Sequence, residues 1–271
     1  MPNTQLNAVI AQRIEVSPSL IILRIVPDGW ELPDFKPGQF GVLGLPGTAE
    51  RYEFSDPEIE LKKPEKIIKR AYSISSASQT KEYIEFFITI VRSGALTPRL
   101  FNLKIGDRVF LGKKFTGIFT LDMIPKDVNV VLLGTGTGLA PYMSMLRSDL
   151  PCNAHRKYIV VHGARHSWDL AYRSELNTLE NVCDNFTYIP AITRPNKEHI
   201  KWGGKTGYIQ DLWKQGIIQE KSGLKPTSEN THFFLCGNPS MIDTMVDTLT
   251  EEGYKEQTKK EKGEIHLERY W

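Results

Sequence analysis

The apolar and polar positions of this chain follow one pattern in its first half and another in its second half. Up to about residue 122, short segments rich in β-branched and aromatic residues are separated by Pro and Gly turns such as Lys36-Pro37-Gly38, a pattern typical of antiparallel strands. Several short strands at this spacing predict an antiparallel β-barrel. The predicted strands are residues 21–26, 39–45, 70–75, 83–91 and 108–111.

After residues 122–127 the pattern changes to alternating strands and helices, which predicts a parallel sheet covered by helices. The last helix is well signalled, because Pro239 opens it and Gly253 ends it. The sequence therefore predicts two domains, an antiparallel β-barrel over residues 1–124 and an α/β parallel-sheet nucleotide-binding domain over residues 125–271. The predicted strands of the second half begin at residues 129, 157, 185 and 232, and the helices cover about 139–146, 168–180, 208–215 and 239–252.

A glycine-rich turn follows the first strand of the second half. Gly134, Gly136 and Gly138 let backbone amides approach a ligand, and the helix start behind them favours negative charge, so a pyrophosphate is the expected ligand. The match to the dinucleotide fingerprint is partial, since Leu139 occupies the third glycine position. A tight strand-to-helix turn without a ligand is the alternative interpretation of this stretch alone.

Three features of the first half bear on ligands. In the strand 84–91, one face is apolar and the other carries Glu85 and Thr89, so a ligand could lie on this mixed second face. Thr97 stands where a helix N-cap belongs, with Pro98 at the first helical position, which predicts either a second anion site or only a capped short helix. The charged stretch Arg51 to Lys69 is predicted to be an exposed, solvated loop.

Composition narrows the function classes. The 34 Lys and Arg against 32 Asp and Glu in 271 residues leave a net charge of +2, which gives no electrostatic indication of nucleic acid. The first residues lack a basic start followed by a long apolar core, and no apolar run approaches the ~20 residues of a membrane helix. A cytoplasmic protein without membrane association is therefore predicted. Cys152, Cys183 and Cys236 are far apart, and neither a disulfide framework nor a zinc or iron–sulfur site is expected.

Residues that follow the strands of a parallel sheet are informative, because ligands bind beyond the carboxyl ends of such strands. Arg165 follows the second strand and Arg194 the third, where an NAD site would place an acid. Two arginines favour a 2′-phosphate, and so NADP over NAD. Cys236-Gly237-Asn238 follows the fourth strand and offers a small thiol and a flexible turn to a planar ring, although a lone buried cysteine is also a common core residue.

These motifs resemble those of a known family. Arg70-Ala71-Tyr72-Ser73-Ile74-Ser75, Gly134-Thr135-Gly136-Thr137-Gly138-Leu139-Ala140-Pro141 and Cys236-Gly237-Asn238-Pro239, in this order, resemble the ferredoxin–NADP reductase family over almost the whole chain. The terminal Tyr270-Trp271 and the short chain are most similar to the bacterial ferredoxin or flavodoxin reductases.

The resemblance implies roles for particular residues. Tyr72 would stack on the FAD ring, Ser73 would hydrogen-bond near flavin N5, and Cys236 would lie where nicotinamide meets the flavin; these are the three predicted catalytic residues. Arg70 would pair with the FAD pyrophosphate. The implied FAD-binding residues are Arg70, Ala71, Tyr72, Ser73, Ser75, Ile88, Thr89, Ile90, Ala95, Leu96, Thr97, Thr137, Tyr270 and Trp271. The implied NADP-binding residues are Gly134, Gly136, Gly138, Ala164, Arg165, Thr193, Arg194, Tyr208, Cys236, Gly237 and Asn238.

The implied enzyme is a monomeric FAD-dependent oxidoreductase that exchanges a hydride with NADP(H) and single electrons with ferredoxin or flavodoxin. Tyr208 departs from the bacterial pattern, which commonly has an arginine there, so a weaker NADP preference is expected. One alternative is an NAD(P)H-dependent reductase component that serves an oxygenase, a cytochrome or free flavin. A second is a non-catalytic flavin-binding subunit that keeps the fold.

Overall fold

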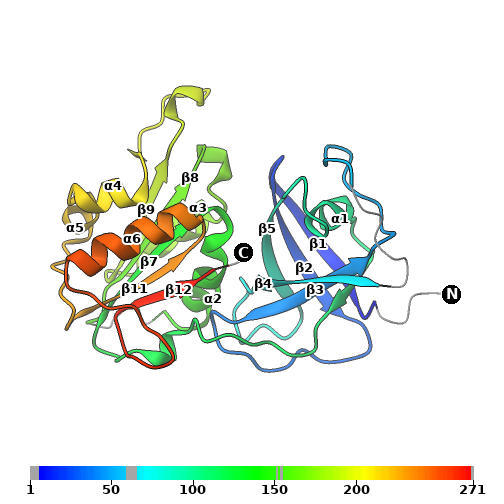
Figure 1. Ribbon diagram of the computed structural model, residues 1–271, viewed down its shortest axis with the longest axis horizontal. Coiled ribbons are helices and arrows are strands. Elements are labelled where there is room, and N and C mark those ends of the chain that lie inside the picture. Colours follow the sequence, from blue (N-terminus) through cyan, green and yellow to red (C-terminus); the bar gives the residue numbers. More distant parts are fainter. Residues whose placement is uncertain (1–5, 59–65, 151, 153–154, 270–271) are drawn as a thin grey trace. The chain divides into compact units, whose positions relative to one another are not determined.

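A computed structural model describes residues 6–58, 66–150, 152 and 155–269. The chain forms two compact units (Figure 1). The first extends to Thr120 and includes Ala140–Asp149, and the second consists of Leu121–Leu139 and the chain from Leu150 onward. Each unit has its own hydrophobic core, as expected for a chain of this length.

The first unit is built on a six-stranded antiparallel sheet in the order β4-β3-β6-β1-β2-β5. An isolated antiparallel bridge joins Ile74, just after β4, to Phe86 in β5, so that the two edge strands meet and the sheet closes. The predicted barrel is therefore confirmed. Its strands are β1 (Ala8–Ser17), β2 (Leu20–Pro27), β3 (Phe40–Pro46), β4 (Ile67–Ser73), β5 (Ile84–Thr89) and β6 (Arg108–Leu111), and the short helix α1 (Thr97–Asn102) follows β5.

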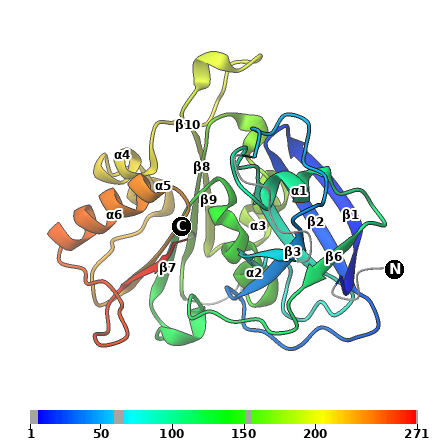
Figure 2. The same cartoon turned by 45° about the vertical axis from the view of Figure 1, so that its right-hand side comes forward.

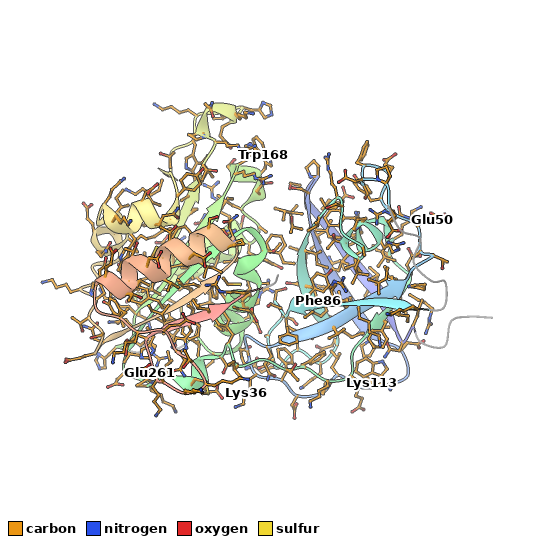
Figure 3. The ribbon with its side chains drawn as sticks, in the orientation of Figure 1. Lys36, Glu50, Phe86, Lys113, Trp168 and Glu261 are labelled. Atoms are coloured by element: carbon orange, nitrogen blue, oxygen red, sulfur yellow. A yellow bond between two sulfur atoms is a disulfide. The ribbon has the colours of Figure 1, made fainter. Side chains whose placement is uncertain are left out.

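The core of the first unit is filled by aliphatic and aromatic side chains such as Leu23, Phe86 and Leu100, each with no exposed surface. Phe86 is labelled in Figure 3. Strand β1 was absent from the prediction, because only Ala8 and Ile10 of its ten residues are buried. Its second half alternates polar and apolar residues, but the apolar Ile14 is 38% exposed, so the strand buries little apolar surface beyond its start.

The second unit holds a six-stranded parallel sheet in the order β10-β9-β8-β7-β11-β12. The order runs from β7 toward β10 on one side and toward β12 on the other, so the sheet has a topological switch point beside β7. Its strands are β7 (Asn129–Thr135), β8 (Tyr158–Ala164), β9 (Phe186–Ile192), β10 (Lys205–Thr206), β11 (Thr231–Cys236) and β12 (Ile265–Glu268). The helices of the second half of the chain are α2 (Ala140–Ser148), α3 (Arg173–Val182), α4 (Ile209–Lys214), α5 (Ile217–Ser222) and α6 (Pro239–Glu251).

Helices α4, α5 and α6 cover the parallel sheet with apolar side chains, and α4 and α6 lie side by side over it (Figure 1). Trp213 of α4 packs edge-on against Phe233 of β11, with ring centroids 5.1 Å apart. Asn238 caps α6, since its Oδ1 accepts hydrogen bonds from the amides of Ser240 at 2.9 Å and Met241 at 3.4 Å. Among the described residues, no helix is both long and apolar enough to span a bilayer.

Helix α3 begins at Arg173 rather than near residue 168. A 3₁₀ turn over Ser167–Asp169 comes first, and Tyr172 then takes a left-handed conformation with φ 59°. This conformation is unfavourable for a residue with a Cβ atom and breaks the helix that the apolar spacing predicted.

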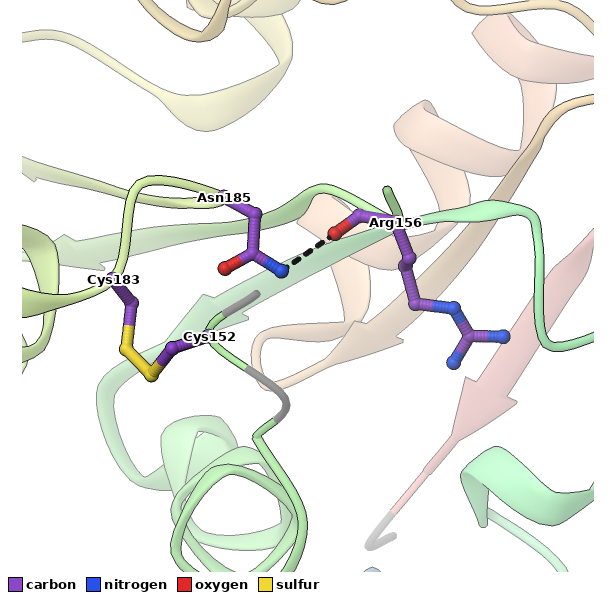
Figure 4. Close-up of a disulfide and its surroundings, with 4 residues drawn as sticks. All are labelled: Cys152, Arg156, Cys183 and Asn185. Atoms are coloured by element: carbon purple, nitrogen blue, oxygen red, sulfur yellow. Dashed lines mark hydrogen bonds between the residues drawn. A yellow bond between two sulfur atoms is a disulfide. The ribbon is translucent and has the colours of Figure 1, made fainter. Parts of the chain in front are cut away.

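A disulfide joins Cys152 and Cys183, although no disulfide framework was expected from the sequence (Figure 4). The two residues are 31 positions apart, but α3 runs back along the sheet and ends at Val182, directly before Cys183, which brings their Cα atoms to 4.5 Å. The bond joins the loop after α2 to the end of α3. Asn185 lies next to it and donates its side-chain N–H to the carbonyl of Arg156 at 2.8 Å (Figure 4).

The stretch Arg51 to Lys69 is not simply a solvated loop, and strand β4 already begins at Ile67. Glu58 receives two hydrogen bonds, of 2.9 and 2.8 Å, from the guanidinium of Arg99, which is only 2% exposed. Arg51 donates to the carbonyls of Gly94 and Arg92, each at 3.0 Å. Residues 51–58 are therefore fixed against α1 and the turn before it, because a buried guanidinium requires a carboxylate partner.

Candidate functional site

The glycine-rich loop presents one open glycine and one packed glycine. At Gly136, where φ is 54°, an added Cβ would find no atom within 4 Å. At Gly138 an added Cβ would lie 2.2 Å from the carbonyl oxygen of Cys236. The loop therefore has backbone open to a ligand at Gly136 and close backbone packing at Gly138, while Gly134 is part of strand β7.

The loop after β7 and the turn after β11 hold each other in place. The amide of Asn238 donates a hydrogen bond of 2.7 Å to Thr135 Oγ1. Gly237 has φ 128°, and a Cβ there would lie 2.2 Å from the same oxygen. Both segments leave neighbouring strands at the switch point of the sheet, which is where parallel sheets bind nucleotides. The two turns pack so closely that only glycine fits at Gly138 and Gly237. Such a glycine-lined turn at a strand end fits a pyrophosphate-containing ligand.

Cys236 is buried at the end of β11 and lies opposite Glu268 in the strand register. Its Sγ is 4.0 Å from Glu268 Oε2. Glu268 was not among the predicted site residues, because β12 was not predicted and only its pairing with β11 brings Glu268 beside Cys236. Its acidic side chain, two residues before Tyr270-Trp271, was the one sequence signal that could have marked it as a site residue. Tyr270 and Trp271 themselves lie outside the described residues.

His162 is a residue of β8, and its ring contacts the glycine-rich loop. The side chain has no exposed surface, and burial lowers its pKa to about 4. The ring is therefore neutral at physiological pH, and its Nε2–H is placed to donate to the carbonyl of Gly136 at 3.2 Å. This bond fixes the direction of the open glycine of the loop.

A second buried histidine is expected to make the fold sensitive to acid. His266 of β12 is 6% exposed, stacks on Phe234 with ring centroids 4.4 Å apart, and has its Nε2 2.9 Å from Nδ1 of His232. Burial, with a smaller effect of His232, lowers the pKa of His266 to about 3. The unfolded chain then binds more protons below its pKa of about 6.5, so stability is present above that pH and is lost as the pH falls.

We expect the free energy of unfolding to drop by about 2 kcal/mol through His266 between pH 6.5 and pH 5. Urea unfolding of the wild type and of His266→Phe at both pH values measures this contribution. The phenylalanine variant should lose less stability over the interval, since it keeps the stacking surface and does not titrate. Equal losses in the two proteins would contradict the prediction.

The two predicted arginines lie side by side at the ends of β8 and β9. Thr193 donates its amide N–H to the carbonyl of Ala164, and Arg194 donates its own to the carbonyl of Arg165, both at 3.0 Å. Both arginine side chains are exposed. Tyr208 stands before α4 and is 60% exposed. The arrangement offers two cations on adjacent backbones to one doubly charged group.

In the first unit, the residues predicted to bind the flavin ring lie on β4. Arg70 and Ala71 are exposed, Tyr72 is half-buried, and Ser73 is 4% exposed. The ring of Tyr72 packs at 71° to that of Phe86, and burial raises its pKa, so it stays a neutral phenol. An aromatic face, a hydroxyl and a cation in sequence along one strand fit the ring and phosphates of a flavin dinucleotide.

The turn before α1 fits an anion, although not through a threonine cap. The residue before the helix is Leu96, and the Thr97 hydroxyl is instead occupied by Val91, whose amide donates to it at 3.0 Å. Within the described chain, no acceptor is found for the amides of Ala95, Leu96 and Thr97. Three successive amides of this kind are suited to a phosphate group.

Some of the predicted flavin residues near β5 are engaged elsewhere. Ile88 is buried in the barrel core, and Ser19 accepts hydrogen bonds from the Thr89 hydroxyl at 3.2 Å and from the Ile90 amide at 3.0 Å. The Ser75 hydroxyl donates to Glu85 Oε1 at 3.0 Å. Thr137 lies half-buried in the 3₁₀ turn after β7.

On the mixed face of β5, Glu85 is buried in an ion cluster and is not open to a ligand, whereas Thr89 is exposed. Glu85 is 1% exposed and receives hydrogen bonds from Arg24 Nε at 2.7 Å and Arg147 Nη1 at 2.6 Å. Arg147 also donates to the carbonyl of Ser75 at 2.8 Å. This cluster ties helix α2, which directly follows the glycine-rich loop, to the segment after β4.

Comparisons with known proteins agree with the ligand-binding features of each unit. A family model described as an oxidoreductase FAD-binding domain matches residues 56–113, and one described as an oxidoreductase NAD-binding domain matches residues 132–247. The chain is 33% identical over 242 residues to the flavodoxin/ferredoxin–NADP reductase of Buchnera aphidicola subsp. Schizaphis graminum, covering 89% of this chain and 90% of that one. It is 30% identical over 238 residues, 88% of each chain, to the enzyme of the same name from Escherichia coli K12.

Among solved structures, a ferredoxin NADP⁺ reductase from Neisseria gonorrhoeae with bound FAD and NADP superposes with a TM-score of 0.82, at 26% identity over 98% of both chains. The barrel followed by the parallel sheet is thus that of a two-domain flavin- and pyridine-nucleotide-dependent oxidoreductase. The chain belongs to the ferredoxin–NADP reductase family. The predictions of the fold class, of an enzyme, and of FAD and NADP(H) as its cofactors are confirmed.

Proposed function

We propose that this protein is a reductase that transfers electrons between NADP(H) and a ferredoxin or flavodoxin. The observation that carries the proposal is the match, over nine-tenths of the chain, to a flavodoxin/ferredoxin–NADP reductase, together with a glycine cradle that fits a dinucleotide. FAD, when bound, supplies the redox chemistry, which links a hydride to single electrons. The residues of the chain bind, orient and protect the reacting groups.

In the first unit, we assign Tyr72 to the face of the flavin ring and Ser73 to a hydrogen bond near its reactive nitrogen. Arg70 keeps its guanidinium on the surface of β4, where it can pair with a phosphate. The amides of Ala95 to Thr97 supply further donors without a charge of their own. These contacts hold the cofactor in one orientation, which is the main contribution that a flavoprotein makes.

In the second unit, the open backbone at Gly136 receives the pyrophosphate of NADP(H), and Arg165 and Arg194 receive its 2′-phosphate. Cys236 provides a small apolar contact for a planar ring. Glu268, 4.0 Å from the Cys236 sulfur, can hold a proton beside that thiol. A carboxyl group in this position is suited to orienting the thiol and to exchanging a proton with it.

The proposal is tested by stopped-flow mixing of the purified yellow protein with NADPH or NADH and then with ferredoxin or flavodoxin. We expect the flavin absorbance to bleach with NADPH and to recover on addition of either carrier. Recovery with a cytochrome or free flavin but with neither carrier would instead support a reductase of another acceptor. No bleaching with either nucleotide would identify a non-catalytic flavin protein. Cytoplasmic location and a monomeric state stay predictions, which cell fractionation and sedimentation can check.

The arginines give a prediction about nucleotide choice. We expect transition-state binding to favour NADPH over NADH by ~1–3 kcal/mol, the scale of hydrogen bonds to charged groups. Arg165→Ala and Arg194→Ala should each raise KM for NADPH and leave the kinetics with NADH almost unchanged, whereas Tyr208→Arg should strengthen the preference. If Arg165→Ala impairs both nucleotides equally, its assignment to the 2′-phosphate is wrong.

A further inference from the structure

Two loops at the carboxyl end of the parallel sheet are joined along their length. The β8 loop comprises residues 165–172, between β8 and α3, and the β9 loop comprises residues 193–204, between β9 and β10. The β9 loop projects beyond the end of the sheet, with β10 at its base (Figure 2). Trp168 of the β8 loop lies at this end of the sheet (Figure 3).

Three contacts connect the β8 loop and the start of α3 to the β9 loop, in the same order along both segments. Ser167 donates its amide N–H to Glu198 Oε1 at 2.9 Å and its hydroxyl to Glu198 Oε2. The ring of Trp168 stacks on those of His166 and His199, with centroids 4.4 and 5.8 Å away. The third contact places the guanidinium of Arg173 over the ring of Trp202 at 4.7 Å.

Glu198 is the polar centre of this connection. Burial on its own would raise the pKa of Glu198, but the two hydrogen bonds from Ser167 and the nearby His166 and His199 outweigh it and hold the pKa below its usual value. The carboxylate is therefore ionised at neutral pH. Hydrogen bonds to an ionised acceptor are stronger than those between neutral groups, so this is the firmest of the three contacts.

Arg165 and Arg194 lie at the beginnings of the β8 loop and the β9 loop. Arg165 precedes Ser167 by two residues, and Arg194 precedes Glu198 by four, across the 3₁₀ turn Pro195–Lys197. The backbones meet where the Arg194 amide donates to the Arg165 carbonyl at 3.0 Å. Two arginines on independent loops would lose much conformational entropy when both bind one anion. A fixed spacing of their backbones reduces this entropy loss.

We propose that Glu198 is a positioning residue for the 2′-phosphate of NADP(H), because it fixes the β9 loop on the β8 loop and so sets the spacing of Arg165 and Arg194. This inference rests on the proposed function. In this proposal, selectivity for NADP(H) depends on the Glu198 carboxylate. By its charge alone, this carboxylate would repel the 2′-phosphate.

The two effects of Glu198 have opposite signs, and substitutions separate them. Glu198→Ala removes both the connection and the negative charge, whereas Glu198→Gln removes the charge and keeps an oxygen that accepts from Ser167. If positioning dominates, the alanine variant binds the phosphate more weakly and the glutamine variant recovers most of the binding. If charge dominates, both variants bind more tightly than the wild type.

The test uses the FAD-loaded enzyme with two probes that differ only in the 2′-phosphate, 2′,5′-ADP and 5′-ADP, by calorimetry. We expect Glu198→Ala to raise Kd for 2′,5′-ADP about tenfold, within the range of one charged hydrogen bond, and to leave Kd for 5′-ADP nearly unchanged. KM for NADPH should rise by a similar factor without a fall in kcat. Ile200→Ala, a change on the same loop at a side chain that is 84% exposed, is the matched control and should behave like the wild type.

A Glu198→Ala enzyme that binds 2′,5′-ADP as tightly as the wild type, or more tightly, overturns the inference. An equal loss for both probes also overturns it, since that would be general damage to the loops. If the alanine variant does not fold, Ser167→Ala and Glu198→Gln apply the same test with smaller expected losses. A wild type that shows no preference for 2′,5′-ADP over 5′-ADP would contradict the proposed NADP(H) specificity itself, before any variant is compared.

Discussion

Glu85→Ala is expected to destabilise the protein by about 3–5 kcal/mol, the usual effect of breaking a buried ion pair by removing one partner. Glu85 is 1% exposed and pairs with the guanidinium groups of both Arg24 and Arg147, which would both lose this buried carboxylate. The Ser75 hydroxyl loses its acceptor at the same time. Urea unfolding followed by circular dichroism measures the change.

Glu82→Ala provides the matched control, because it removes the same charge from an exposed position just before β5. It should change stability by less than about 0.5 kcal/mol. Arg24→Ala should fall between the two, since Arg24 is 31% exposed and Arg147 remains to pair with Glu85. A Glu85→Ala protein with the stability of the Glu82→Ala control would show that the ion cluster contributes little to the fold.

The second large effect is expected at Gly138. In Gly138→Ala the new Cβ would lie 2.2 Å from the Cys236 oxygen and 2.7 Å from the Gly237 nitrogen, which is closer than any real carbon contact. The glycine-rich loop and the Cys236 turn must therefore separate. Because a displacement of about 1 Å in a reacting site can cost about a hundredfold in rate, we expect flavin reduction by NADPH to slow by at least this factor.

Gly136→Ala distinguishes close packing from backbone conformation. No atom lies within 4 Å of a Cβ at Gly136, so the variant carries only the conformational penalty of its φ of 54°, about 1–2 kcal/mol. Stopped-flow reduction by NADPH, with melting temperatures as the folding control, compares the two variants. Wild-type reduction rates in Gly138→Ala would contradict the assignment of Gly138 as the close-packed position of the loop.

The division into a barrel and a parallel sheet could be predicted from the sequence, because strand and helix periodicities are local properties of the chain. The same holds for the glycine-rich loop and for Arg165 and Arg194, since residues that follow the strands of a parallel sheet must gather at one edge. What could not be predicted were the short or half-exposed strands. β10 has two residues, too few to show a period, and only the first half of β1 faces the core. β12 is a four-residue segment whose place in the sheet comes from its pairing with β11.

Side-chain partners far apart in the sequence were decided only by the tertiary structure. Alternation along β5 marked Glu85 as polar, but only the packing of β2 and α2 around it shows that it is buried between two arginines. Cys152 and Cys183 pair because α3 returns along the sheet, and Glu268 meets Cys236 because β12 aligns in register with β11. Ion pairs, disulfides and strand registers depend on distances that the folded backbone sets, whereas the sequence alone determines which local segments are available to be brought together.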